Sequence, residues 1–137
     1  MSLTMAHAVS DHIVVTFSPQ PSVAAFLQRI VDAAGFTANA TASTVEELET
    51  LVQHVSPDAV VYEIGFPFAA NWDRLVAARQ RPGLQNMAFV ITTGDARELY
   101  RRVGVPAAIE LFRKPDDFTE LRGAILGAIR EAAPVSA

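Results

Sequence analysis

A single carboxylate, that of Glu63, stands at the end of an apolar segment that is typical of a buried strand. The segment covers residues 59–62, and residues 64–67 follow with the sequence Ile-Gly-Phe-Pro. In α/β proteins, ligands bind where the carboxyl ends of the strands form an edge of the sheet. We therefore expect Glu63 to mark the functional centre, as a nucleophile or as an anion that pairs with a cation.

Other polar residues are predicted at the same edge because each follows a predicted strand. They are Ser18, Thr93 and Lys114, and Pro19 stands beside Ser18. A hydroxyl and an ammonium group are suited to binding an anion. Three further acids lie on loops near this edge, at Asp95, Asp116 and Asp117. Their spacing before helix-like segments predicts helix caps rather than cation ligands.

Length and composition limit the functions that are open to the chain. It has 137 residues, half of them apolar, a formal charge of −4 and no cysteine. One domain with one core is expected, with no disulfide, no zinc–thiolate site and no direct binding of nucleic acid. No apolar run approaches the roughly 20 residues of a membrane span, so we expect a cytoplasmic protein. Histidines at 7, 12 and 54 are scattered, which indicates neither a metal site nor a catalytic base.

Strand-like and helix-like segments alternate along the chain. The predicted strands cover residues 13–17, 36–41, 59–64, 87–92 and 108–113. Between and after them, apolar stripes with helical spacing begin near Val23, Val45, Trp72, Ala96 and Phe118. Such alternation predicts a (βα)5 α/β fold, a doubly wound parallel sheet in a three-layer sandwich. We assign residues 1–10 to a disordered or added N-terminal segment, 11–131 to the domain and 132–137 to a tail.

Local signals mark the ends of two helices. Ser43 and Glu46 have the spacing of a capping box before the second helix. The fourth helix is predicted to run from Ala96 to Val103 and to stop at Gly104.

Two motifs in this chain resemble the receiver domain of two-component response regulators. Residues 57–67 resemble the strand and loop that carry the phosphoacceptor, and residues 112–115 resemble the Lys-Pro turn. A strand that ends in Thr93 and Gly94 separates them, with the spacing of a receiver. The resemblance covers residues 13–129 and implies the flavodoxin-like strand order 2-1-3-4-5.

The resemblance also implies a site, and this chain departs from it. In receivers an Asp at the tip of the third strand attacks a phosphodonor, and two acids after the first strand help to hold magnesium. The acceptor position here is Glu63, one methylene longer. The acid pair falls on Ser18 and Pro19, or on Phe17 and Ser18 in a register shifted by one. A hard cation binds poorly without carboxylates, so we expect no autophosphorylation, no metal and no cofactor.

Three other positions match the switch of a receiver. Thr93 matches the hydroxyl that senses the phosphoryl group, Lys114 matches the lysine that pairs with it, and Leu111 takes the place of the usual aromatic residue. We expect Glu63 to extend toward Lys114. Such a contact either mimics the switched-on state or is only an ion pair that joins two loops; both alternatives stay open.

The resemblance implies a signalling module that is not an enzyme and that acts through protein contacts. Its partner would be a signalling protein or an output domain, with a histidine kinase as one candidate, or a second copy bound through the fourth helix, fifth strand and last helix. Tyr100, Arg101 and Arg102 are the predicted partner surface, although a Tyr at helical spacing is more often half-buried.

A rival function belongs to a different class. The same fold can hold a small-molecule-binding or enzymatic site in the cleft around Ser18, Glu63, Thr93 and Lys114. The aromatic cluster of Phe66, Phe68 and Trp72 beside Glu63 is predicted to be core packing under the loop, with a recognition patch as the alternative.

Overall fold

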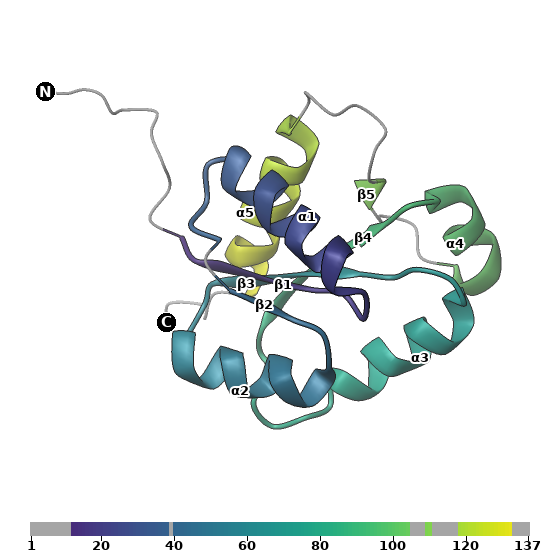
Figure 1. Cartoon of the computed structure of the whole chain (residues 1–137), viewed down its shortest axis with the longest axis horizontal. Helices are drawn as coiled ribbons and strands as arrows, with labels where there is room; N and C mark the ends of the chain where they lie inside the picture. The colour runs from purple at the N-terminus through teal and green to yellow at the C-terminus, as the bar shows by residue number, and fades with distance from the viewer. Residues whose placement is uncertain (1–11, 39, 105–108, 111–117, 133–137) are drawn as a thin grey trace, which may run out of the picture.

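The computed structural model describes residues 12–38, 40–104, 109–110 and 118–132, in which strands and helices alternate (Figure 1). The strands are β1 (Val14–Phe17), β2 (Thr41–Ala42), β3 (Ala59–Glu63), β4 (Ala88–Thr93) and β5 (Ile109–Glu110). The helices are α1 (Pro21–Ala33), α2 (Val45–Val55), α3 (Phe68–Ala78), α4 (Ala96–Val103) and α5 (Thr119–Ala132). No helix in the described part of the chain has the length and apolar character needed to cross a membrane.

The strands form a parallel sheet, and the predicted order β2-β1-β3-β4 is confirmed. Ile109 and Glu110 of β5 pair with Thr92 and Thr93, at the end of β4. The rest of the fifth strand predicted over residues 108–113 lies outside the described residues. The carboxyl ends of β1, β3 and β4 therefore share one edge.

Side chains of the central strands alternate between two apolar layers, as the pleat requires. One layer lies under α1 and α5 and includes Val14, Leu27, Val61, Val90 and Ile125. The other lies under α2, α3 and α4 and includes Val15, Leu48, Tyr62, Leu75 and Leu99. Figure 1 shows the sheet between these two sets of helices, which confirms the predicted layers.

The second strand differs from its prediction. It covers Thr41–Ala42 rather than residues 36–41, and among the described residues before it Thr37 alone forms a bridge, to Ile13. Phe36 and Ala38 are buried, but they fill the layer under α1 and α5 as part of a connection. Their apolar character reflects this packing and does not indicate a long strand.

The start of α2 lies one residue later than the capping box predicted from Ser43 and Glu46. The side chain of Thr44 accepts a hydrogen bond from the Glu47 amide at 3.1 Å, and Glu47 Oε1 accepts one from the Ser43 amide at 2.6 Å. The motif is therefore present in a shifted register, because two overlapping Ser/Thr-x-x-Glu patterns occur here.

Both predicted ends of α4 are confirmed. Asp95 Oδ1 accepts a hydrogen bond from the Glu98 amide at 3.0 Å, so this aspartate is an N-cap as expected. At the other end, Gly104 adopts a left-handed conformation with φ of 76° and donates its amide proton to the Tyr100 carbonyl.

Candidate functional site

Glu63 lies at the tip of β3, and its described partner is Ser18. The Ser18 hydroxyl donates a hydrogen bond to Glu63 Oε1 at 3.1 Å and accepts one from the Gln20 amide at 3.1 Å. Ser18 is fully buried, and Glu63 is only 9% exposed. Because Ser18 directly follows β1, which pairs with β3, the two side chains meet at the edge where the acids of a receiver would gather.

Burial controls the electrostatics of this carboxylate. Removal from water raises the pKa of the Glu63 carboxyl group above its usual value, and the hydrogen bond from Ser18 lowers that pKa in part. Gly65 gives the carboxylate its space, because a Cβ atom on this residue would lie 2.7 Å from Glu63 Oε2. The local sequence Glu-Ile-Gly thus allows Glu63 to lie close to its own loop.

Thr93 is buried at the tip of β4, and its hydroxyl is engaged with the backbone. Its Oγ1 atom donates a hydrogen bond to the Ile64 carbonyl at 2.7 Å and accepts a longer one from the Asp95 amide at 3.4 Å. In the register of the sheet, the residue opposite Glu63 is Thr92. Thr93 therefore holds the segment that follows Glu63, and its role as a phosphate sensor stays a prediction.

The remaining predicted site residues are only partly described. Pro19 is exposed beside Ser18. Lys114 and Leu111 lie outside the described residues, as do Asp116 and Asp117, so the contact between Glu63 and Lys114 stays a prediction. The described residues contain no cluster of three or more side chains from His, Cys, Asp and Glu that could hold a metal ion.

Asn71 of α3 is a residue of this region that the sequence analysis missed. It is 9% exposed, its Nδ2 atom donates to the Gly65 carbonyl at 2.9 Å, and its Oδ1 atom accepts from Arg74 Nη1 at 2.9 Å. Asn71 thus holds the β3–α3 loop against α3. The available signal was a polar residue on the stripe that Leu75 and Ala78 continue on the buried side of the helix.

The aromatic cluster beside Glu63 divides into two parts. Phe68 and Trp72 are partly buried against the layer under α2, α3 and α4, as the core-packing interpretation predicts. Phe66 is 81% exposed, so that interpretation is wrong for this residue. Its ring meets that of Phe68 edge-on, with the centroids 6.3 Å apart. The carbonyl groups of Gly65 and Pro67 accept hydrogen bonds from Asn71, whereas the Phe66 ring between them projects into solvent.

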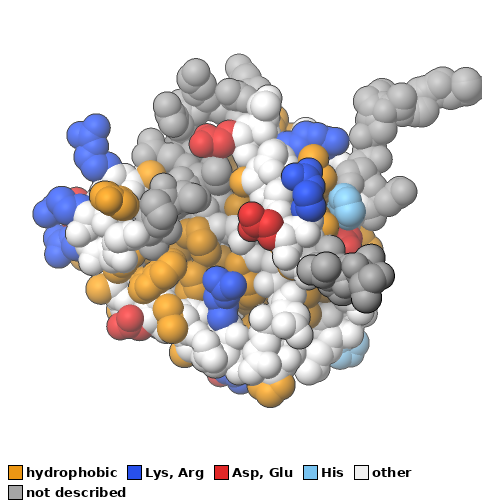
Figure 2. Space-filling model, turned by 180° about the vertical axis from the view of Figure 1, so that it is seen from behind, with side chains coloured by type: hydrophobic (Ala, Val, Ile, Leu, Met, Phe, Trp, Pro, Cys, Tyr) orange, Lys and Arg blue, Asp and Glu red, His pale blue; other side chains and the backbone are white. Residues whose placement is uncertain are grey.

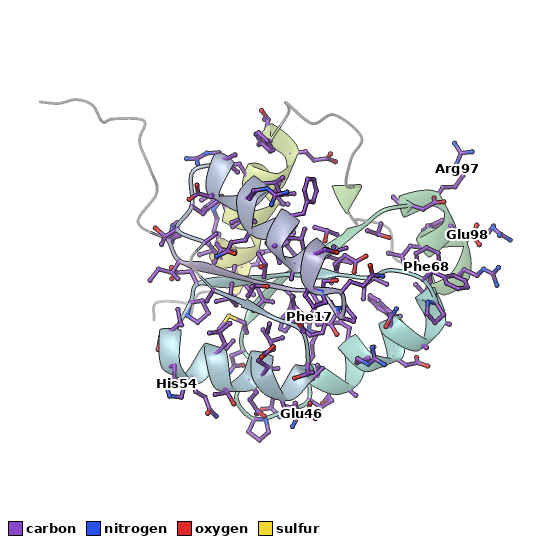
Figure 3. The ribbon with its side chains drawn as sticks, in the orientation of Figure 1. Phe17, Glu46, His54, Phe68, Arg97 and Glu98 are labelled. Carbon is purple, nitrogen blue, oxygen red and sulfur yellow. The ribbon has the colours of Figure 1, made fainter. Side chains whose placement is uncertain are left out.

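The predicted partner surface lies on α4. Tyr100 is 59% exposed, so it is a surface residue rather than half-buried packing. Arg101 and Arg102 both contact Glu98, at 2.6 and 2.8 Å. Figure 3 shows Arg97 and Glu98 on the outer side of this helix, and Figure 2 shows basic side chains gathered at the same end of the molecule.

Comparison with known proteins gives a likeness of structure and not of sequence. No protein-family model and no curated protein matches this chain. A sensor protein from Polaromonas sp. JS666 matches with a TM-score of 0.68 and 18% identity, over 90% of this chain and 100% of that one. A response regulator receiver domain protein from Clostridium thermocellum matches with a TM-score of 0.59 and 21% identity, over 88% and 95%.

A third solved structure agrees with these two. The receiver domain of the response regulator PhyR from Erythrobacter litoralis has a TM-score of 0.61 and 18% identity, over 93% of this chain and 98% of that domain. All three identities are low, so the likeness concerns the arrangement of strands and helices. The chain has the fold of response regulator receiver domains.

Proposed function

We propose that this protein is a receiver-like signalling module of a two-component or phosphorelay system that acts through protein contacts and is not phosphorylated. The receiver fold and the receiver-like motifs at Glu63 and Lys114 support the first part. The observation that carries the second part is the hydrogen bond from Ser18 to Glu63. A neutral hydroxyl occupies the position from which a working receiver supplies an acid.

The physical argument concerns charge. Magnesium requires near-octahedral oxygen ligation and is bound through carboxylates together with substrate phosphates. Ser18 and Pro19 contribute no negative charge, and burial favours the protonated form of Glu63. A phosphoryl group brought to this edge would thus lack the cation that neutralises its developing charge. No enzymatic role is part of this proposal.

Glu63 can serve such a module in two ways. It mimics the phosphorylated state permanently, or it only ties β1 to β3. The Ser18 contact favours the second role, since it holds the carboxylate toward β1. Replacement of Glu63 by Gln separates the two: a structural role leaves self-association and partner binding unchanged, whereas a mimic loses both.

We propose that partners bind at α4. The exposed ring of Tyr100 lies on the same short helix as Arg101 and Arg102. Aromatic and arginine side chains are enriched in protein interfaces. Candidate partners are a histidine kinase, an output domain or a second copy. Analytical ultracentrifugation of Tyr100→Ala tests the last of these, with the exposed Arg29→Glu on α1 as the matched control.

The proposal is tested by incubation of the protein with a small phosphodonor and magnesium, followed by intact-mass measurement. We expect no added mass. A variant with Asp at positions 18, 19 and 63 restores the acids of a receiver, and a receiver that retains its own acids serves as the positive control. A gain of about 80 Da by the unmodified chain would contradict the proposal.

A further inference from the structure

An open pocket of about 400 Å³ lies between the start of α2 and the C-terminal half of α3. Its volume is within the range of small-molecule sites, roughly 300–1,000 Å³. Residues that line it include Phe17, Val45, Glu46, Arg74, Ala77 and Arg81. Neither Glu63, Ser18 nor Thr93 is among its lining residues, so the pocket is distinct from the edge described above.

The two arginines of the pocket differ in their partners. Arg81 donates to Glu49 at 2.9 Å and lies 3.7 Å from Glu46, so its charge is matched. Arg74 contacts only the neutral amide oxygen of Asn71 and has no carboxylate within ion-pair distance among the described residues. A guanidinium group carries five N–H donors. Arg74 therefore offers unmatched positive charge and free donors at the pocket wall.

The rest of the lining is mixed, with hydroxyl groups from Ser43 and Thr44 beside apolar side chains. Phe17 is 1% exposed and closes the base of the pocket, with its ring stacked on Tyr62 at a centroid distance of 4.2 Å. Ala77 adds a small side chain from α3, and Val45 an apolar one from α2. Figure 3 shows Phe17 between the sheet and the lower helices, with Glu46 at the start of α2. Ala77 and Val45 therefore supply the apolar contact for an occupant whose polar end faces Arg74.

Acidic residues at the start of α2 disfavour an occupant with more than one negative charge. Glu46 and Glu47 lie in its first turn, where they place negative charge beside the pocket. The Glu47 amide is already bound by Thr44. A dianion such as a phosphate ester would meet this repulsion, whereas one carboxylate can reach Arg74 on the opposite wall.

We propose that this pocket binds a small monoanionic molecule whose carboxylate is held by Arg74 and whose apolar body lies against Ala77 and Val45. The site is independent of the proposed signalling function, but it is connected to the Glu63 loop. Arg74 contacts Asn71, and Asn71 in turn donates to the Gly65 carbonyl. A carboxylate that recruits the Arg74 guanidinium changes this chain of hydrogen bonds and is thereby sensed at Gly65.

Titration of the full chain with 2-naphthoate, followed by backbone amide NMR, tests the proposal. We expect saturable shifts at Arg74, Ala77 and Gly65. The neutral analogue 2-naphthylmethanol should bind about tenfold more weakly, because it lacks the charge-assisted hydrogen bond. Equal affinity of the two compounds, or tighter binding of a naphthalene dicarboxylate, would overturn the assigned ligand class.

Variants of α3 locate the site. Arg74→Gln should weaken 2-naphthoate binding about tenfold, and Ala77→Trp should block it by filling the pocket. Ala77 is exposed, so the larger side chain leaves the core intact. Arg79→Gln is the matched control, because Arg79 lies over the Phe89 ring and outside the pocket. Equal binding by the Arg74 and Arg79 variants, or an unmoved Gly65 amide, would contradict the proposal.

Discussion

The edge at Glu63 and the pocket at Arg74 handle charge in opposite ways. Glu63 is buried and accepts a hydrogen bond from Ser18, and the Thr93 hydroxyl beside it is bound to a backbone carbonyl. Arg74 faces an open pocket with one neutral partner. The comparison teaches that, among the described residues, the polar groups at the Glu63 edge are engaged by internal contacts, whereas Arg74 has donors left for a ligand.

Among the described residues, the buried side chain of Asn71 joins the two regions. The Asn71 side chain accepts a hydrogen bond from Arg74 and donates one to the carbonyl of Gly65, which lies two residues after Glu63. Buried amides are costly to leave unpaired, so this link is both a structural anchor and the route by which one region affects the other.

The largest effect is expected when this link is removed. Asn71→Ala deletes two hydrogen bonds and leaves the Gly65 carbonyl without its partner, which should lower the free energy of unfolding by about 2–3 kcal/mol. Urea unfolding measures the loss. Asn86→Ala, at an exposed position, should change stability by less than about 0.5 kcal/mol. Equal losses in the two variants would show that Asn71 does not anchor the loop at Gly65.

The next largest loss of stability is expected when the hydrogen bond between Ser18 and Glu63 is removed. Ser18→Ala removes the donor to Glu63 and should lower the free energy of unfolding by about 1–2 kcal/mol, because the buried carboxyl group loses this hydrogen-bond partner. Chemical unfolding measures this, with the exposed Ser22→Ala as control. A negligible loss would mean that another group holds Glu63.

A smaller effect, a gain in stability, is expected for a substitution of Tyr62, whose ring stacks on Phe17. The Tyr62 hydroxyl is buried without a hydrogen-bond partner among the described residues, and burial raises its pKa to about 12. Tyr62→Phe removes this unsatisfied group and keeps the ring stacked on Phe17, so it should stabilise the fold by about 1 kcal/mol. Thermal unfolding tests the sign. Destabilisation would indicate that the hydroxyl has a partner after all.

The smallest effect is a dependence on pH. The pKa of Glu63 is raised in the folded protein, so the folded state holds this proton more tightly than the unfolded state. The resulting stability is present below the unfolded pKa, near 4.5, and is lost as the pH rises through the folded value. Relative to the Glu63→Gln variant, the unmodified chain should therefore lose free energy of unfolding as the pH rises from about 4.5 toward 7.

Unfolding curves at several pH values measure this difference, and Glu120→Gln at an exposed position is the control. The opposite trend, with the unmodified chain gaining stability as the pH rises, would indicate a strong cationic partner for Glu63. Lys114 is the predicted candidate for that partner.

Much of the fold could be predicted from the sequence because its signals are local. The ends of α4 follow from Asp95 and Gly104, and the doubly buried β3 follows from its continuous apolar run. The second strand could not be predicted, since Phe36 is buried by tertiary packing rather than by pairing. The start of α2 was ambiguous because Ser43 and Thr44 each have a glutamate three residues later.

The candidate site was predicted less completely. The sequence indicated that Glu63 and Ser18 share one edge, since both follow adjacent parallel strands. It did not indicate that they contact each other, because side-chain orientation at a strand tip depends on burial and on the space left by Gly65. Asn71 and the pocket at Arg74 arise from the placement of α2 against α3, for which no short motif exists.

The account rests on the claim that the edge at Glu63 is closed to a divalent cation. Titration of the protein with magnesium, followed through the backbone amides of Ser18, Glu63 and Gly65, tests this claim most directly. The account predicts no saturable shift at these amides up to about 10 mM. Saturable shifts confined to these three residues, with an affinity of about 1 mM or tighter, would contradict it.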